Sequence, residues 1–119
     1  MRIRFVVAVL VACWSLGAAA LATEMYDRST PGDGETISES PAEFYIVFLE
    51  GIYLTSVRLR GSDGSEWPID WKKTEENVFN TRFRTERPLP PGDYQIEWDA
   101  YVRQHLHDDG GTIKFTIKP

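Results

Sequence analysis

The chain contains two histidines, and they stand two positions apart, at His105 and His107, followed directly by Asp108 and Asp109. If this stretch is extended, both imidazoles project to the same side, because side chains alternate along a strand. Such a pair suits copper(II), zinc or nickel, and Asp108 could add a ligand or a hydrogen-bond acceptor. The alternative is a solvated loop that holds two polar rings, because H-x-H is short and common. Two imidazoles also leave a divalent metal short of ligands, so other donors must come from elsewhere.

Other kinds of active site find little support in the sequence. The only cysteine, Cys13, lies in the N-terminal segment described below, so the rest of the chain has no thiolate for nucleophilic chemistry, zinc or copper(I). We find no nucleophile elbow and no phosphate-cradling glycine loop. Adjacent acids such as Glu75–Glu76 are usually solvated surface residues. We therefore predict a protein that binds something small and is not an enzyme.

The first 22 residues have the pattern of a secretory signal. Two arginines near the start precede an apolar run, and small residues lead up to Ala22, where we expect cleavage. The uninterrupted apolar stretch is short for crossing about 30 Å of hydrocarbon. A competing interpretation is a bacterial lipobox at Leu10–Cys13, which would make a lipidated Cys13 the mature terminus. We predict a signal peptide over 1–22, an exported domain over 23–119, and a periplasmic location.

The charge of the exported part limits its partners. Removing 22 of 119 residues leaves 97, enough for one modest domain with a single core. Arg2 and Arg4 leave with the signal, so 11 basic and 18 acidic residues remain, a net charge of −7. This acidic balance excludes a basic footprint for nucleic acid and disfavours an anionic membrane surface. We expect a monomer that does not insert into a membrane once the signal is cleaved.

Short runs of aromatic and β-branched residues, separated by turn residues, predict an all-β fold. No window shows sustained helical periodicity, and Gly, Pro, Asp and Ser clusters recur at short intervals. This spacing is typical of an immunoglobulin-like or cupredoxin-like Greek-key sandwich or barrel of about seven strands. The expected strands are 44–48, 54–59, 78–83, 94–100 and 112–117, with short pieces around 25–28 and 66–69.

The tryptophans have two interpretations. Trp98 shares the inward parity of its strand and is expected in the core. Trp67 and Trp71 flank Pro68 in a less regular stretch, where they could stack on a ligand or pack against the core. Packing is the favoured interpretation, because such residues are usually substantially buried.

Four segments in order resemble one known family. They are Tyr26–Gly34 (YDRSTPGDG, similar to L-x-x-S-x-P-A-D-G), Val47–Glu50 (similar to a strand ending F-S-E), Leu89–Trp98 (similar to L-x-x-G-x-Y-x-V-x-W) and Gly111–Ile117 (similar to G-x-x-x-F-x-V). Together they resemble the CopC family, periplasmic copper-binding proteins of copper resistance. The resemblance covers nearly all of residues 23–119.

The resemblance implies a copper(II) site with four parts: an N-terminal histidine, the glutamate of F-S-E, and an Asp-x-His pair before the last strand. Glu50 matches the glutamate, and His107 matches the histidine. His105 stands where the aspartate is usual, if one residue is inserted after Trp98. The expected mature terminus is Thr23 rather than histidine, although its α-amine or Glu24 could still bind. The methionine-rich copper(I) segment of some family members is also absent, since Met25 is the only methionine after the predicted signal.

The predicted function is therefore periplasmic copper binding for copper resistance or homeostasis, with one copper(II) held by His105, His107 and Glu50, and Asp108 as a further candidate. An inner-membrane copper transporter or an envelope protein is a possible partner implied by the resemblance. The rival interpretation is a CopC-like interaction module that has lost its metal and docks an envelope protein. A copper-dependent oxidative enzyme is a third hypothesis, which the missing terminal histidine disfavours.

Overall fold

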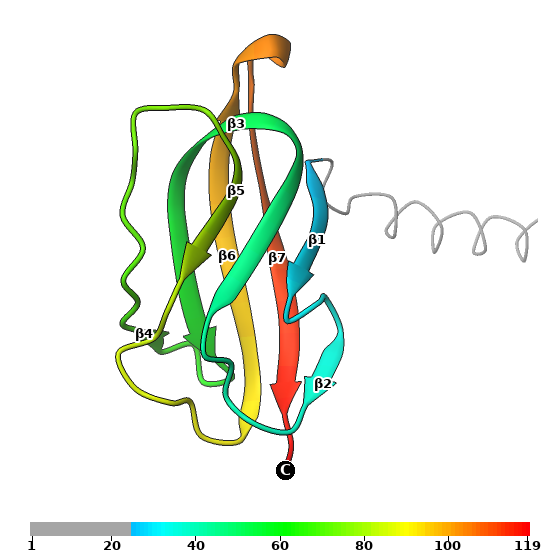
Figure 1. The fold of residues 1–119 in the computed structure, drawn as a ribbon, viewed down its shortest axis with the longest axis vertical. Coiled ribbons are helices and arrows are strands. Elements are labelled where there is room, and N and C mark those ends of the chain that lie inside the picture. Colours follow the sequence, from blue (N-terminus) through cyan, green and yellow to red (C-terminus); the bar gives the residue numbers. More distant parts are fainter. Residues whose placement is uncertain (1–24) are drawn as a thin grey trace, which may run out of the picture.

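A computed structural model describes residues 25–119 as a β-sandwich (Figure 1). The predicted signal peptide over 1–22 and the alternative lipidation site at Cys13 lie outside the described residues. In chain order the elements are β1 (Tyr26–Thr30), β2 (Glu35–Ile37), β3 (Phe44–Gly61), β4 (Glu66–Trp67), β5 (Val78–Phe83), β6 (Gly92–Val102), the 3-10 turn η1 (Arg103–His105) and β7 (His107–Ile117). None of the described helical turns is long and apolar enough to span a bilayer.

Strand β3 belongs to both layers of the sandwich. Its first part pairs antiparallel with β1 and β5, and its later part pairs antiparallel with β6 and β4. The second layer continues from β6 to β7, antiparallel, and from β7 to β2, parallel. Pairing with β5 is interrupted between Val47 and Ile52. Glu50 and Gly51 lie in this interruption, where β3 passes from one layer to the other.

Alternation along the strands builds the core. On β6, every second residue from Tyr94 to Val102 is at most 6% exposed. Aromatic rings join the two layers: Phe48 meets Trp98 edge to face at 5.0 Å, and Phe44 stacks on Phe83 at 4.8 Å. Burying each such side chain stabilises the fold by about 1.5–3 kcal/mol. Among residues 25–119, no polar or charged residue is fully buried, so apolar packing holds the domain together.

The predicted fold class is confirmed, with seven strands, but two details differ. The segments expected as separate strands over 44–48 and 54–59 form the single 18-residue strand β3. Strand β2 was not expected, because Glu35–Ile37 is too short to show alternation. The packing interpretation of the tryptophans is also confirmed. Trp98 is 1% exposed, and Trp67 and Trp71 are partly buried against the core.

The two ends of the sandwich carry different residues. The histidine pole is the end where β6 turns into β7; it holds Glu50, His105 and His107 and lies at the top of Figure 1. The pocket pole is the opposite end, where β6 begins at Gly92 and β7 ends at Ile117.

Candidate metal centre

The connection between β6 and β7 sets the positions of both histidines. β6 ends at Val102, which pairs with His107, so the reversal is made by residues 103–106. Arg103–His105 form a 3-10 turn, and Leu106 closes it in the left-handed region, at φ 53°, with its N–H bonded to the carbonyl of Arg103. The condition of an extended segment is therefore not met between Arg103 and Leu106, because a reversal this tight requires helical and left-handed backbone. Strand alternation does not place the two rings.

The rings nevertheless lie close together. The centroids of His105 and His107 are 5.6 Å apart, with 30° between the ring planes. Both residues are exposed. The guanidinium of Arg103 lies 5.3 Å from the ring centroid of Tyr53 on β3, which ties the turn to the sheet.

Glu50 reaches His105 across 55 positions of sequence. Its Oε1 lies 3.0 Å from Nε2 of His105, and the two side chains are 36% and 47% exposed. Glu50 is not at the end of a strand, as the family pattern suggested, but in the bend of β3 between the two layers. The bend directs the chain past the β6–β7 turn, so this contact is a product of the fold and not of local sequence.

The hydrogen bonds indicate which nitrogen of each ring is free. Nδ1 of His107 lies 2.9 Å from the backbone carbonyl of Asp108. A carbonyl only accepts, so Nδ1 donates and Nε2 keeps its lone pair. A carboxylate oxygen accepts, so Nε2 of a neutral His105 ring donates to Glu50, which leaves Nδ1 with the lone pair. The neutral rings thus offer one donor nitrogen each, and Glu50 is placed to orient His105 in the manner of a carboxylate behind a metal-binding imidazole.

The two aspartates after His107 occupy different environments. Asp108 pairs with Tyr101 and is exposed, and no described contact brings its carboxylate to either ring. Asp109 pairs with Ala100 on the inward parity of β7. Its Oδ1 accepts from the N–H of Gly110, and its Oδ2 is buried with no hydrogen-bond partner among the described residues. The sequence suggested Asp108 as a candidate metal ligand and did not single out Asp109. Alternation counted back from the buried Ile113 places Asp109 on the inward side of the strand.

The histidine pole does not contain a complete coordination shell. Throughout residues 25–119, no three His, Cys, Asp or Glu side chains are grouped so that they could hold a metal ion. The structure brings Glu50 to His105 and His105 to His107, and it leaves Asp108 apart. The donor types suit copper(II), but two imidazoles and one orienting carboxylate need further ligands.

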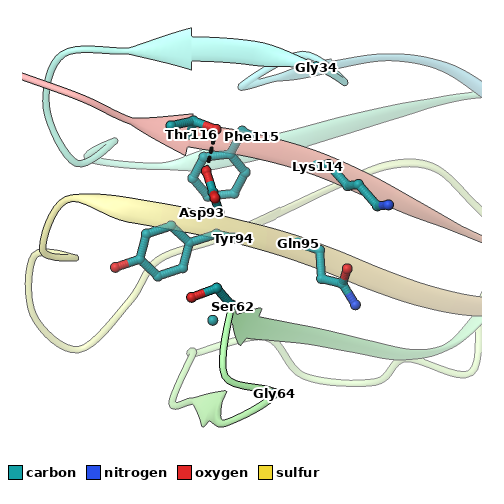
Figure 2. Close-up of a pocket in the computed structure, with 10 residues that line it drawn as sticks. Gly34, Ser62, Gly64, Asp93, Tyr94, Gln95, Lys114, Phe115 and Thr116 are labelled. Carbon is teal, nitrogen blue, oxygen red and sulfur yellow. Dashed lines mark hydrogen bonds between the residues drawn. The ribbon is translucent and has the colours of Figure 1, made fainter.

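An open pocket of about 420 Å³ lies at the pocket pole (Figure 2). Several of its polar groups are already paired within the protein. Asp93 accepts a hydrogen bond from Thr116 at 2.7 Å, and the backbone N–H of Lys114 donates to Asp33 at 2.9 Å. Gly34 donates from its backbone to the carbonyl of Lys114. These contacts use part of the hydrogen-bonding capacity of the pocket.

Comparison with known families agrees with this architecture. The family model of the CopC domain matches residues 26–118, almost all of the described chain. The chain belongs to the CopC family. Two solved structures share its fold. PcoC from Escherichia coli, described as a methionine-rich copper resistance protein, is 22% identical with a TM-score of 0.62; the match covers 82% of this chain and 99% of PcoC. CopC from Methylosinus trichosporium OB3b is 18% identical with a TM-score of 0.66, covering 80% of this chain and 93% of that one.

Among curated protein sequences, none matches the chain. The CopC family assignment therefore rests on the family model, and the solved structures, at these identities, support the fold.

Proposed function

We propose that this CopC-family chain is a periplasmic copper-binding protein of copper resistance or homeostasis, which holds one copper(II) at the histidine pole. The observation that carries the proposal is the contact of Glu50 with His105, which has His107 beside it. The fold brings these residues together from distant parts of the chain. Neutral imidazoles and carboxylates are suitable copper(II) ligands, and the family and its structural relatives favour copper over other metals.

In this proposal the primary ligands are Nδ1 of His105 and Nε2 of His107, the nitrogens left free by the hydrogen bonds described above. Glu50 holds the His105 ring by accepting from its Nε2–H, and could become a ligand if that ring turns. Orienting carboxylates of this kind are typically worth 10- to 100-fold in metal affinity. Asp108 is a weaker candidate, since its side chain would have to reorient.

The missing donors are proposed to come from the mature N-terminus. The carbonyl of Met25 accepts a hydrogen bond of 2.8 Å from the N–H of Leu49, the residue before Glu50. The described chain therefore begins beside the histidine pole. If cleavage follows Ala22, the α-amine of Thr23 and the carboxylate of Glu24 are two residues or fewer from Met25. Mass spectrometry of the exported protein would show whether Thr23 is the first residue.

The proposal is tested by titrating residues 23–119 with copper(II) and measuring heat and visible absorbance. One equivalent should bind, and His107→Ala should weaken binding about tenfold or more, equivalent to at least 1.4 kcal/mol. Lys114→Ala, on the same strand but towards the pocket pole, is the matched control and should bind copper normally. Absence of binding at neutral pH would remove the proposal, and an unchanged affinity in His107→Ala would move the site elsewhere.

Acid should release the metal, because protons compete with it for the imidazole nitrogens. Repeating the titration over a pH series should show the affinity falling as the pH is lowered through the range in which histidine titrates. An affinity independent of pH across that range would contradict imidazole ligation.

A second candidate is a CopC-like module that docks an envelope protein without metal. The incomplete shell within residues 25–119 favours it. The copper titration separates the two, because the docking module predicts no specific equivalent of copper bound. Both candidates describe binding and neither requires catalysis.

A further inference from the structure

Asp109 places a carboxylate on the inner face of the β6–β7 pair. Every second residue of β6 from Trp98 to Val102 is at most 3% exposed and faces the core. Asp109 pairs with Ala100, and His107 pairs with Val102. Directly paired residues of an antiparallel ladder point to the same side of the sheet. Asp109 and His107 therefore share the inner side of β7, two positions and about 7 Å apart along the strand.

The charge of Asp109 is not compensated by a cation of the described chain. Its Oδ1 accepts from the N–H of Gly110 at 2.8 Å, and its Oδ2 is buried without a hydrogen-bond partner among the described residues. From residue 25 to residue 119, no lysine or arginine forms an ion pair with it. The guanidinium of Arg103 lies over the ring of Tyr53, which pairs with Tyr101 on the outer face of the sheet. A buried carboxylate without a cation destabilises the folded state.

The surroundings of this carboxylate are largely apolar. Ala100 lies directly opposite Asp109, and Trp98, diagonal to it on β6, packs its ring against Phe48 at 5.0 Å. The indole N–H of Trp98 is buried as well, and it has no acceptor among the described residues. A donor on the same face therefore leaves the carboxylate unbonded. In such surroundings a charge acts on a neighbouring ion more strongly than it does in water.

We propose that Asp109 sets the charge preference of the histidine pole, so that copper(II) is held in preference to copper(I). The carboxylate lies behind His107 on the same side of β7 and attracts the ion without being one of its ligands. This attraction is proportional to the charge of the ion, so it favours the divalent ion. The same carboxylate destabilises the metal-free fold, and a bound divalent ion offsets that effect. The inference rests on the proposed copper site and adds to it a residue that determines specificity.

Asp109→Asn tests the inference, because it keeps the oxygen that accepts from Gly110 and removes the charge. Titration of the exported protein with copper(II), and under nitrogen with copper(I) in the presence of a competing chelator, gives an affinity for each ion. The affinity for copper(II) should fall about tenfold and that for copper(I) about threefold, because the lost attraction is twice as large for the doubly charged ion. The ratio of the two affinities then changes about threefold, which corresponds to a rise of about 30 mV in the reduction potential.

A second measurement on the same variant needs no metal. Urea denaturation of metal-free Asp109→Asn should give a midpoint about 0.5 M higher than that of the unsubstituted protein, because a neutral amide is less costly to bury than an unpaired carboxylate. A residue that only held the strands together would lower the midpoint when replaced. Glu66→Gln is the matched control: it removes the same charge from an exposed residue on β4, paired with Arg60 towards the pocket pole. This control should leave the ratio of the two copper affinities unchanged.

The outcomes distinguish failure of this inference from failure of the proposed function. Equal losses of affinity for the two ions in Asp109→Asn would mean that Asp109 acts as a ligand or through the shape of the site, and would overturn the inference. Unchanged affinities would overturn it as well and leave the proposed copper site standing. A lower urea midpoint would show that the charge is compensated in the metal-free fold. If the unsubstituted protein binds no copper(II), the proposed function and this inference both fail.

Discussion

The two poles of the sandwich are built from the same strands but use their side chains in opposite ways. At the pocket pole, Asp93 is hydrogen-bonded to Thr116 (Figure 2), and Asp33 accepts from the backbone N–H of Lys114. At the histidine pole, each imidazole keeps a nitrogen free, and Leu49, Phe79 and Leu106 face solvent. The histidine pole therefore presents free imidazole nitrogens and exposed apolar side chains, whereas part of the polar surface at the pocket pole is bonded within the chain.

This difference shows that the proposed copper site is identified by its donor groups and not by a cavity. The pocket at the pocket pole is a concave space, and two carboxylates at it, Asp93 and Asp33, accept hydrogen bonds from within the protein. The histidine pole has a protruding turn, but its donors and apolar surface are available to something else. The proposed copper site rests on these free donors at the β6–β7 turn.

The largest expected effect on stability comes from replacing a glycine by alanine towards each end of the sandwich. A methyl group at Gly110 would stand 2.7 Å from the backbone oxygen of Trp98, a contact that only backbone movement can relieve. Gly110→Ala should therefore lower the free energy of unfolding by about 3 kcal/mol, the upper range for overpacking. It should also weaken copper binding, because β6 and β7 hold the turn that carries His105. At Gly34 a methyl group would meet nothing within 4 Å, but the φ of 81° is unfavourable for alanine. Gly34→Ala should therefore lower the free energy of unfolding by about 1 kcal/mol and leave copper binding intact.

Urea denaturation of the two metal-free variants, followed by a copper titration of each, measures both quantities. If Gly34→Ala weakened copper binding as much as Gly110→Ala, the two poles would not be independent.

Substituting one polar side chain at each pole should separate stability from binding. His105→Ala removes an exposed group, so the free energy of unfolding should change by less than about 0.5 kcal/mol while copper affinity falls about tenfold. Asp93→Ala removes the hydrogen bond from Thr116, so the free energy of unfolding should fall by about 1 kcal/mol while copper affinity stays unchanged. Thermal melts and copper titrations of both variants complete the test. A copper defect in Asp93→Ala would show that the pocket pole contributes to the site.

Much of the fold was predictable, because alternation is a local signal. The inward positions of β6 and β7 follow from residues such as Ile96, Trp98 and Phe115, which repeat every second position. Strand β3 was predicted as two pieces because Glu50 and Gly51 interrupt the apolar pattern. That interruption proved to be a bend within one strand, and sequence has no separate signal for a strand that changes layers. Strand β2, with three residues and one parallel partner, was too short to detect.

The candidate site was predictable in residue type but not in geometry. The sequence identified His105, His107 and Glu50 from their chemistry and from family resemblance. It did not predict the 3-10 turn or the left-handed Leu106, because no glycine or asparagine marks the position. The hydrogen bond of Glu50 to His105 depends on packing between segments 55 positions apart, which no local pattern encodes. Strand parity predicts that the side chain of Asp109 faces inward. Asp108 is the same residue type, so chemistry alone did not distinguish the two.

The smallest expected effect lies on the outer face of the second layer, between the two poles. Arg60 donates to Glu97 at 2.9 Å, and this hydrogen bond is the main reason the pKa of Glu97 is lowered; burial opposes it, and Gln95 adds to it. The pKa of Asp99 is lowered chiefly by the hydrogen bond from Ser56, against burial, with help from Arg58.

Groups with a lowered pKa in the folded state stabilise it above their ordinary pKa and lose that contribution as the pH falls through the folded value. Metal-free protein should thus lose stability from about pH 4 downwards, the ordinary range for these carboxyls. Glu97 is partly exposed, so its share is less than about 1 kcal/mol. Glu97→Gln should flatten the acid side of a plot of unfolding free energy against pH. Because this network lies on the strands and not in the β6–β7 turn, His105→Ala should keep the slope of the unsubstituted protein. A changed slope in that variant would mean that the histidine pole, and not the outer face, senses acid.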